Sequence, residues 1–292
     1  MAVNGLVMMG AEGLDMAARL EVTTERDVSY AVVDGRDLRL DIYRSGHADA
    51  PVVIYVHGGG WAHGDKGTDG PTRLARLAAY GVDVVAVDYR LAPQATFPEP
   101  LYDLKGAVRW LRANTASHGL AVDRVGVWGA SAGAYLGSLL ALSAGDPHLE
   151  GKVGGNLDQS SAVQAVVHWF GAVDLEASAA RTDLEQRLML SPFEHAFLGT
   201  ADPVTFAARA RQLNLLARIS SGVPPFLIAH GDRDRIVPPS EGLSLNDALG
   251  RAGAESRLEL LAGAGHEDPA FDTPAMLAST AAWMRVALRP SG

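Results

Sequence analysis

The chain has 292 residues, of which 48% are hydrophobic and 20% are charged, and its formal net charge is -9. This composition is typical of a folded chain with a large core, not of a disordered one. The chain has no cysteine, which excludes a disulfide scaffold, a thiolate nucleophile and Cys-ligated metal sites, and its acidic balance without a basic run argues against nucleic-acid binding.

The N-terminal stretch and the apolar runs of the sequence bear on export and on membrane insertion. The N-terminal stretch MAVNGLVMMGAEGLDMAARLE has no Lys or Arg before its short apolar run, whereas a secretory signal carries positive charge there. No apolar run in the sequence approaches the roughly 18 residues that span a bilayer. We therefore expect a soluble, cytoplasmic protein with no membrane partner.

From residue 28 onward, apolar strand patterns alternate with helical patterns. The later strands are short runs of Val, Ile and Leu, as in strands covered on both faces, and the first two alternate with charges, as at an antiparallel edge. The predicted strands are Val28–Val33, Leu38–Tyr43, Val52–Val56, Val82–Val87, Arg124–Trp128, Ala165–Phe170, Pro225–Ala229 and Arg257–Leu261. The predicted helices are Thr72–Tyr80, Pro100–Thr115, Ala132–Ala144, Ser240–Ala252 and Pro274–Leu288.

This alternation predicts a single α/β domain over 1–292, with a mostly parallel eight-stranded sheet and helices on both faces. Ligands of such sheets bind at the carboxyl ends of the strands. Two regions stand outside the alternation: an N-terminal extension, 1–27, and a helical, cap-like insertion at about 174–222. Whether the insertion covers a pocket or is an ordinary surface excursion stays open.

The clearest chemical motif is GASAG at Gly129–Gly133, which has the form G-x-S-x-G. A sharp turn from strand to helix strains the backbone of Ser131 and leaves no room for flanking side chains, so glycine is needed on both sides. The pentapeptide alone can arise by chance in a Gly- and Ala-rich loop. Its position between a predicted strand and a predicted helix instead indicates a nucleophile at Ser131.

A serine nucleophile needs a base and a group that orients the base. The stretch PPFLIAHGDRDRIVP ends a predicted strand and supplies Asp232 and Asp234, and RLELLAGAGHEDP supplies His266 after the last strand. We expect Asp234 as the orienting acid, because Asp232 lies nearer the strand, where it can brace the turn. His266 follows the loop that carries Asp232 and Asp234, here called the acid loop. His230, which ends a strand, is interpreted as a buried structural group.

Acyl chemistry also needs hydrogen-bond donors for the oxyanion. The stretch YVHGGGWAHGDK follows a predicted strand, and its consecutive glycines let backbone N–H groups converge on one oxygen. We predict Gly59 and Gly60 as donors, together with the N–H of Ala132. A phosphate loop would need G-x-x-x-x-G-K-[ST], which is absent here. His57 is expected to hold the loop, and Trp61 either lines the substrate pocket or packs.

Five motifs occur in order between about residues 51 and 266: HGGGW, DYRLAP, GASAG, HGDRD followed by VP, and GH. In these the chain resembles the α/β-hydrolase superfamily, and within it the hormone-sensitive-lipase-like and BD-FAE-type carboxylesterases. The resemblance implies the α/β-hydrolase fold, a Ser131–Asp234–His266 triad and an HGG-type oxyanion hole. For DYRLAP we expect Arg90 to pair with a nearby acid such as Asp88 or Asp103.

The sequence thus predicts a serine hydrolase that cleaves carboxylic esters of small molecules through an acyl-enzyme and needs no metal or organic cofactor. An amidase of the arylformamidase type and a tailoring enzyme for acyl transfer or thioester release stay open as alternatives. A non-catalytic small-molecule binding protein is less favoured, because such proteins usually lack a triad member. Acyl preference and pairing into a homodimer also stay open.

Overall fold

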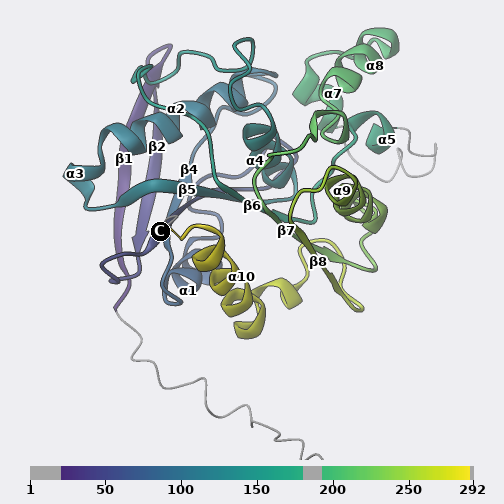
Figure 1. Ribbon diagram of the computed structural model, residues 1–292. Helices are drawn as coiled ribbons and strands as arrows, with labels where there is room; N and C mark the ends of the chain where they lie inside the picture. The colour runs from purple at the N-terminus through teal and green to yellow at the C-terminus, as the bar shows by residue number, and fades with distance from the viewer. Residues whose placement is uncertain (1–20, 180–192, 290–292) are drawn as a thin grey trace, which may run out of the picture.

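The computed structural model describes residues 21–179 and 193–289, and these fold around a twisted eight-stranded sheet (Figure 1). The strand order is β1-β2-β4-β3-β5-β6-β7-β8. Pairs β1–β2 and β2–β4 are antiparallel, and every other pair is parallel, so the predicted mostly parallel sheet is confirmed. The strands are β1 (Thr23–Val33), β2 (Arg36–Arg44), β3 (Pro51–Val56), β4 (Asp83–Val87), β5 (Ala121–Ala130), β6 (Ala165–Trp169), β7 (Phe226–Gly231) and β8 (Ser256–Leu261).

Several predicted boundaries differ from the structure by a few residues, and two of these differences change how a segment is described. Strand β1 starts at Thr23 rather than Val28, so the predicted extension 1–27 overlaps the sheet, and residues 1–20 lie outside the described residues. Its first residues are mostly solvent-exposed and charged, which hides them from an apolar pattern, yet they pair with β2 along an edge. The predicted helix Thr72–Tyr80 is a π-helical turn, η2 (Gly70–Leu74), followed by α1 (Ala75–Ala78).

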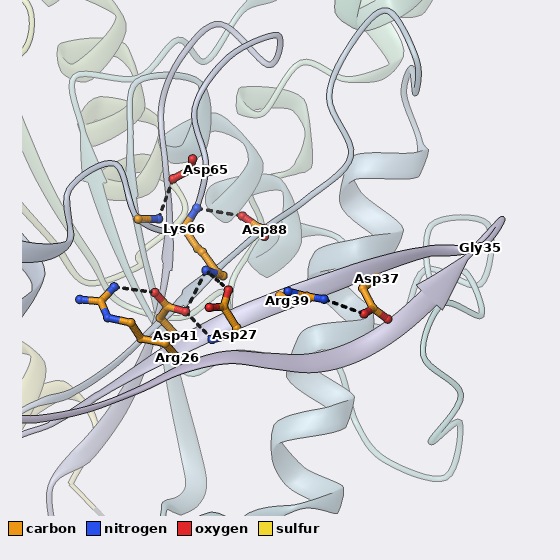
Figure 2. Close-up of a pocket in the computed structure, with 10 residues that line it drawn as sticks. Arg26, Asp27, Gly35, Asp37, Arg39, Asp41, Asp65, Lys66 and Asp88 are labelled. Carbon is orange, nitrogen blue, oxygen red and sulfur yellow. Dashed lines mark hydrogen bonds and ion pairs between the residues drawn. The ribbon is translucent and has the colours of Figure 1, made fainter.

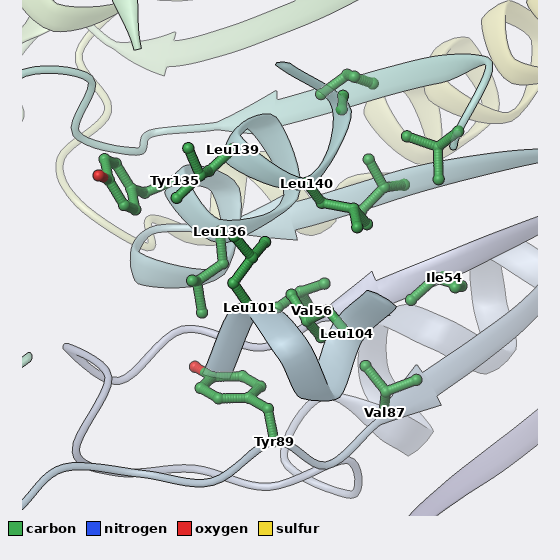
Figure 3. Close-up of a cluster of buried hydrophobic side chains, with 14 of the residues drawn as sticks. Ile54, Val56, Val87, Tyr89, Leu101, Leu104, Tyr135, Leu136, Leu139 and Leu140 are labelled. Carbon is green, nitrogen blue, oxygen red and sulfur yellow. The ribbon is translucent and has the colours of Figure 1, made fainter. Parts of the chain in front are cut away.

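Alternate side chains of β3 enter two separate cores, as the pleat of a strand requires. Ile54 and Val56 face a cluster that includes Leu101 and Leu104 of α2 and Leu136 of α4 (Figure 3). These side chains are fully buried, and burial of each leucine stabilises the fold by about 1.5–3 kcal/mol. The helices on this face are α2 (Glu99–Ala113), α4 (Ala132–Leu142) and α9 (Pro239–Arg251).

The opposite face of the sheet receives Val53 and Tyr55 of β3, packed with side chains of α1 and α10 (Pro274–Ala287). Figure 1 shows these two helices on the other side of the sheet from α2, α4 and α9. Thr273 is the N-cap of helix α10, and its hydroxyl accepts a hydrogen bond from Met276 N at 3.3 Å. Helices therefore cover both faces, as predicted.

The carboxyl ends of the parallel strands gather the loops that carry the predicted site. The chain from the predicted insertion lies near these ends and contains α5 (Leu175–Ala179), α7 (Phe193–Leu198), α8 (Pro203–Gln212) and the 3-10 turn η3 (Leu216–Arg218). Residues 180–192 of this insertion lie outside the described residues. Two short helices complete the fold, α3 (Thr115–His118) and the 3-10 turn η4 (Pro269–Asp272).

None of the helices in the described ranges combines the length and apolar character that crossing a bilayer requires.

Candidate active site

Ser131 occupies a sharp turn between β5 and α4. Its backbone has φ 53° and ψ -120°, a conformation that L-residues rarely adopt, and its N–H donates to the carbonyl of Trp169 at 2.9 Å. A Cβ on Gly129 would overlap the carbonyl of Gly133, and a Cβ on Gly133 would overlap the carbonyl of Val56. Both glycines of GASAG are therefore required by close backbone contacts, which the strained turn brings about.

The structure brings together three predicted site residues that are distant in sequence. Ser131 Oγ lies 2.9 Å from His266 Nε2, and His266 Nδ1 lies 2.7 Å from Asp234 Oδ2. Each of the three follows the carboxyl end of a strand: β5 for Ser131, β7 for Asp234 and β8 for His266. The chain of hydrogen bonds joins a hydroxyl, an imidazole and a carboxylate in the order that nucleophilic catalysis uses.

Asp234 is held as an anion by its surroundings. Burial of its side chain opposes ionisation, but hydrogen bonds from His230, His266 and the backbone N–H of Val237 outweigh burial and hold its pKa well below the usual range. Its second oxygen, Oδ1, accepts from the backbone N–H groups of Ile236 at 2.8 Å and Val237 at 2.9 Å. The carboxylate is therefore ionised and fixed in orientation at neutral pH.

Asp232, the other acid of this loop, has a different role in the fold. Its Oδ1 accepts from the backbone N–H of Gly263 at 2.7 Å, which ties the loop after β7 to the loop after β8. The structure thus places Asp234, and not Asp232, against His266.

The glycine-rich loop after β3 is shaped by His57, which is buried. The His57 ring stacks on Tyr89 with centroids 4.4 Å apart, its Nδ1 lies 2.8 Å from the carbonyl of Gly58, and the Tyr89 hydroxyl donates to the His57 carbonyl at 3.0 Å. Tyr89 belongs to DYRLAP, and the next residue, Arg90, forms a two-pronged ion pair with the buried Asp103. Of the two acids considered for Arg90, the structure selects Asp103.

Gly59 and Gly60 both have positive φ values, 99° and 60°, and lie beside Ser131 in the wall of one cavity. Within residues 21–179 and 193–289, neither of their backbone N–H groups has an acceptor. Ala132 is the first residue of α4, so its N–H has no acceptor within the helix. The three predicted donors thus lie where their N–H groups are free to bind a ligand oxygen.

The cavity at Ser131 has a volume of about 230 Å³. Trp61 both lines this cavity and packs: its ring stacks on Phe197 at 4.6 Å, and its Nε1 donates to the carbonyl of Ala132 at 3.1 Å. The other residues that line the cavity were not assigned to the site from the sequence, namely His63, Ala172, Phe193, Glu194, Ile236, Val237 and Glu267. Two of them carried a signal in the sequence: Val237 belongs to the VP motif, and Glu267 directly follows His266.

A larger hollow of about 760 Å³ lies elsewhere, on the β1–β2 side of the sheet (Figure 2). Acidic side chains of this hollow form ion pairs with basic side chains that also line it. Lys66 Nζ contacts Asp27 at 2.8 Å and Asp41 at 2.9 Å, and Arg26 contacts Asp41 at 3.2 Å. None of its lining residues belongs to the cavity at Ser131. We therefore assign the hollow to structural ion pairing.

Comparison with known proteins gives the same family. The BD-FAE family model matches residues 40–249. The chain is 36% identical over 222 residues to the esterase LipC of Mycobacterium tuberculosis, which covers 74% of this chain and 53% of LipC. The chain spans about half the length of the curated relatives it matches first.

Solved structures of esterases share the fold. A truncated carbohydrate esterase from gut microbiota superposes with a TM-score of 0.82 and 25% identity, over 93% of this chain and 98% of that chain. The esterase LipW from Mycobacterium marinum gives a TM-score of 0.73 and 26% identity, over 92% of this chain and 83% of that chain. The predicted α/β-hydrolase fold is confirmed, and the chain belongs to the BD-FAE family.

Proposed function

We propose that the protein is a serine hydrolase that cleaves carboxylic esters of small molecules through a covalent acyl-enzyme. The observation that carries this proposal is the hydrogen-bonded chain from Ser131 Oγ to His266 and Asp234, at 2.9 and 2.7 Å, which opens into a cavity of about 230 Å³. The similar proteins reported above are each named as esterases, which supports the same reaction class.

In the acylation half-reaction, His266 Nε2 takes the proton of Ser131 as Oγ attacks the ester carbonyl. The N–H groups of Gly59, Gly60 and Ala132 donate to the oxyanion of the tetrahedral intermediate. The protonated imidazole then gives its proton to the leaving alkoxide, and the alcohol departs. Asp234 keeps the tautomer of His266 and stabilises the imidazolium ion without taking the proton itself.

In the deacylation half-reaction, water replaces the alcohol. His266 takes a proton from the water as it attacks the acyl-enzyme, and the same proton returns to Ser131 Oγ as the acid is released. The net reaction consumes one water for each ester, and it yields one carboxylic acid and one alcohol. No cofactor enters the scheme, and a cytoplasmic location and a homodimer stay predictions.

The test is the Ser131→Ala variant. We expect it to lose turnover of p-nitrophenyl acetate and covalent labelling by a fluorophosphonate, while its circular dichroism and Tm stay close to wild type. A Ser138→Ala variant is the matched control, because Ser138 is a buried serine of α4, the helix that follows Ser131, and its Oγ lies 2.8 Å from His168 Nδ1 rather than against His266. Wild-type activity in Ser131→Ala would overturn the proposal.

Two further sets of substrates measure the substrate range. A chain-length series of p-nitrophenyl esters measures the acyl size that the cavity accepts. Matched ester and formamide substrates distinguish an esterase from an amidase of the arylformamidase type: we expect kcat/KM for the ester to exceed that for the formamide by at least about tenfold.

A further inference from the structure

Glu267 follows His266 directly and lines the same cavity as Ser131. A Cβ built on Gly58 would lie 3.2 Å from Glu267 Oε1 and 3.3 Å from Ser131 Cβ. Since both atoms lie so close to one point, they are at most about 6.5 Å apart. A carboxylate therefore stands beside the nucleophile, although no step of the proposed mechanism uses it.

The carboxylate of Glu267 is available to a ligand. It makes no hydrogen bond or ion pair with any residue in the described ranges, and the side chain is solvent-exposed. The neighbouring acid, Asp268, is used by the fold, since its oxygens accept from Ala270 N at 2.9 Å and Gly265 N at 3.3 Å. The loop after β8 thus carries one acid that shapes the turn and one that does not.

The backbone of Glu267 has φ 52°, in the left-handed region that favours glycine or asparagine. A glutamate in this conformation is strained, and strained residues of this kind cluster at functional sites. Glycine or asparagine would adopt this backbone conformation with less strain than glutamate. The carboxylate side chain is therefore what glutamate adds at this position.

The exposed acid of the cavity lining is Glu267, whereas Glu194 is buried. Among the described lining residues there is no Lys or Arg, and the other titratable groups are His63 and His266. Arg233 and Arg235 flank the acid Asp234 in sequence and are exposed, but neither lines the cavity. A positively charged group of a ligand can therefore approach the carboxylate of Glu267 without passing a Lys or Arg of the described lining.

We propose that Glu267 makes the enzyme selective for esters whose alcohol part carries a positive charge, and that it disfavours esters of anionic alcohols. This inference rests on the proposed function. We place this carboxylate against the alcohol part because Glu267 directly follows His266, which protonates the leaving oxygen in the proposed mechanism. A unit charge on the ligand within about 5–7 Å of this carboxylate, at a partly hydrated surface, changes kcat/KM by about three- to tenfold.

The experiment uses three acetates of similar size that differ in charge: acetylcholine, its neutral isostere 3,3-dimethylbutyl acetate, and 2-acetoxyethanesulfonate. All three release acetate, so one acetate assay measures kcat/KM for each. For the wild type at low salt we expect kcat/KM for the cationic ester to exceed that for the neutral ester by about three- to tenfold. We expect kcat/KM for the neutral ester to exceed that for the anionic ester by a similar factor. Addition of 0.5 M salt should compress both ratios, because charges screen one another over about 10 Å or less at such ionic strengths.

The Glu267→Gln variant removes the charge and keeps the shape. We expect the cation-to-anion ratio of kcat/KM to fall at least about fivefold. Because the ratio compares two substrates on the same variant, it does not depend on a change in overall activity. The matched control is Glu255→Gln, because Glu255 is an exposed glutamate before β8, at the strand end opposite His266, and its loss changes the net charge equally. That variant should keep the wild-type ratio.

The outcomes separate this inference from the proposed function. Equal ratios in wild type and Glu267→Gln, or equal loss in Glu255→Gln, would overturn the role of Glu267 while the neutral acetate is still hydrolysed. Neutral turnover that survives Ser131→Ala would instead overturn the proposed function. A wild type that hydrolyses none of the three acetates contradicts both.

Discussion

His230 Nε2 lies 3.4 Å from Oδ2 of Asp234, the oxygen that His266 Nδ1 also contacts. The same nitrogen lies 2.9 Å from the carbonyl of Val237, so Nε2 faces two acceptors and carries its proton. His230 is fully buried, and its other nitrogen, Nδ1, has no hydrogen-bond partner in the described part of the chain. His230 thus packs under the loop that carries Asp234 and directs an N–H toward its carboxylate.

We expect His230→Leu to lower kcat for p-nitrophenyl acetate by about tenfold and to destabilise the fold by about 1–3 kcal/mol, because the Val237 carbonyl loses its donor. His230→Gln keeps an N–H at a similar reach and should recover most of kcat. Steady-state kinetics and urea unfolding measure both effects. Equal kcat in the Leu and Gln variants would show that His230 only fills space.

Asp234→Asn should lower kcat by about 10⁴-fold, because an amide in this place favours the wrong tautomer of His266. Asp232→Asn is the matched control, since within the described ranges the side chain of Asp232 accepts only from the backbone N–H of Gly263. It should change kcat by less than about tenfold and act mainly on stability. Similar losses in both variants would contradict the assignment of Asp234, and single-turnover kinetics with p-nitrophenyl acetate decide it.

Gly60→Ala tests the oxyanion loop. A Cβ on Gly60 would lie 2.5 Å from Cδ1 of Phe193, and the φ of 60° strains any other residue. We expect kcat to fall by about 10²-fold as the loop moves and its donors lose alignment. Gly119→Ala is the control for φ alone, because Gly119 has φ 58° and open space around it.

A second variant separates steric from backbone effects at Gly60. Adding Phe193→Ala to Gly60→Ala removes the clash and leaves the strain, so part of the lost kcat should return. If the double variant is no better than Gly60→Ala, the clash with Phe193 is not the cause of the loss.

His168 gives the fold a pH dependence of its own. Burial of the ring lowers its pKa to about 4 and outweighs the Gly171 carbonyl, 3.0 Å from Nε2, which acts in the opposite direction. A folded pKa below the unfolded value of about 6.5 means that the unfolded chain binds the proton first as pH falls. Stability is therefore full above about pH 6.5 and declines toward pH 4, by about 2 kcal/mol at pH 5.

Urea unfolding at pH 7 and pH 5 measures this loss. His168→Gln should be less stable than wild type at pH 7 but should lose about 2 kcal/mol less between the two pH values. His148→Gln, which removes an exposed histidine, should keep the wild-type pH dependence. An unchanged pH dependence in His168→Gln would show that another group titrates.

The sheet could be predicted because its signal is local. Short Val- and Ile-rich runs such as Val52–Val56 and Ala165–Phe170 define buried strands by composition, and the alternation with helices fixes parallel order. The signal for the sharp turn at Ser131, the elbow between β5 and α4, is also local, because close contacts within the turn require its glycines. Strand β1 began earlier than predicted because edge pairing tolerates charged residues that an apolar pattern skips.

The walls of the cavity could not be predicted in the same way. Phe193 and Glu194 come from the insertion, Ile236 from the acid loop and Glu267 from the loop after β8, and only the fold brings them together. Trp61 shows the limit within a motif: its sequence position allowed either packing or pocket lining, and the structure gives it both. Side-chain convergence across loops depends on tertiary geometry, which no local pattern encodes.

The carbonyl of Val56, at the end of β3, leaves no space for a side chain at Gly133, so the elbow and the glycine-rich loop are in direct backbone contact. A larger side chain at Gly133 would displace the backbone at the end of β3. Attempts to redesign the acyl range by directed evolution should therefore leave both segments fixed and randomise Phe193 and Ile236 instead, where variation reshapes the pocket while the reacting atoms stay in register.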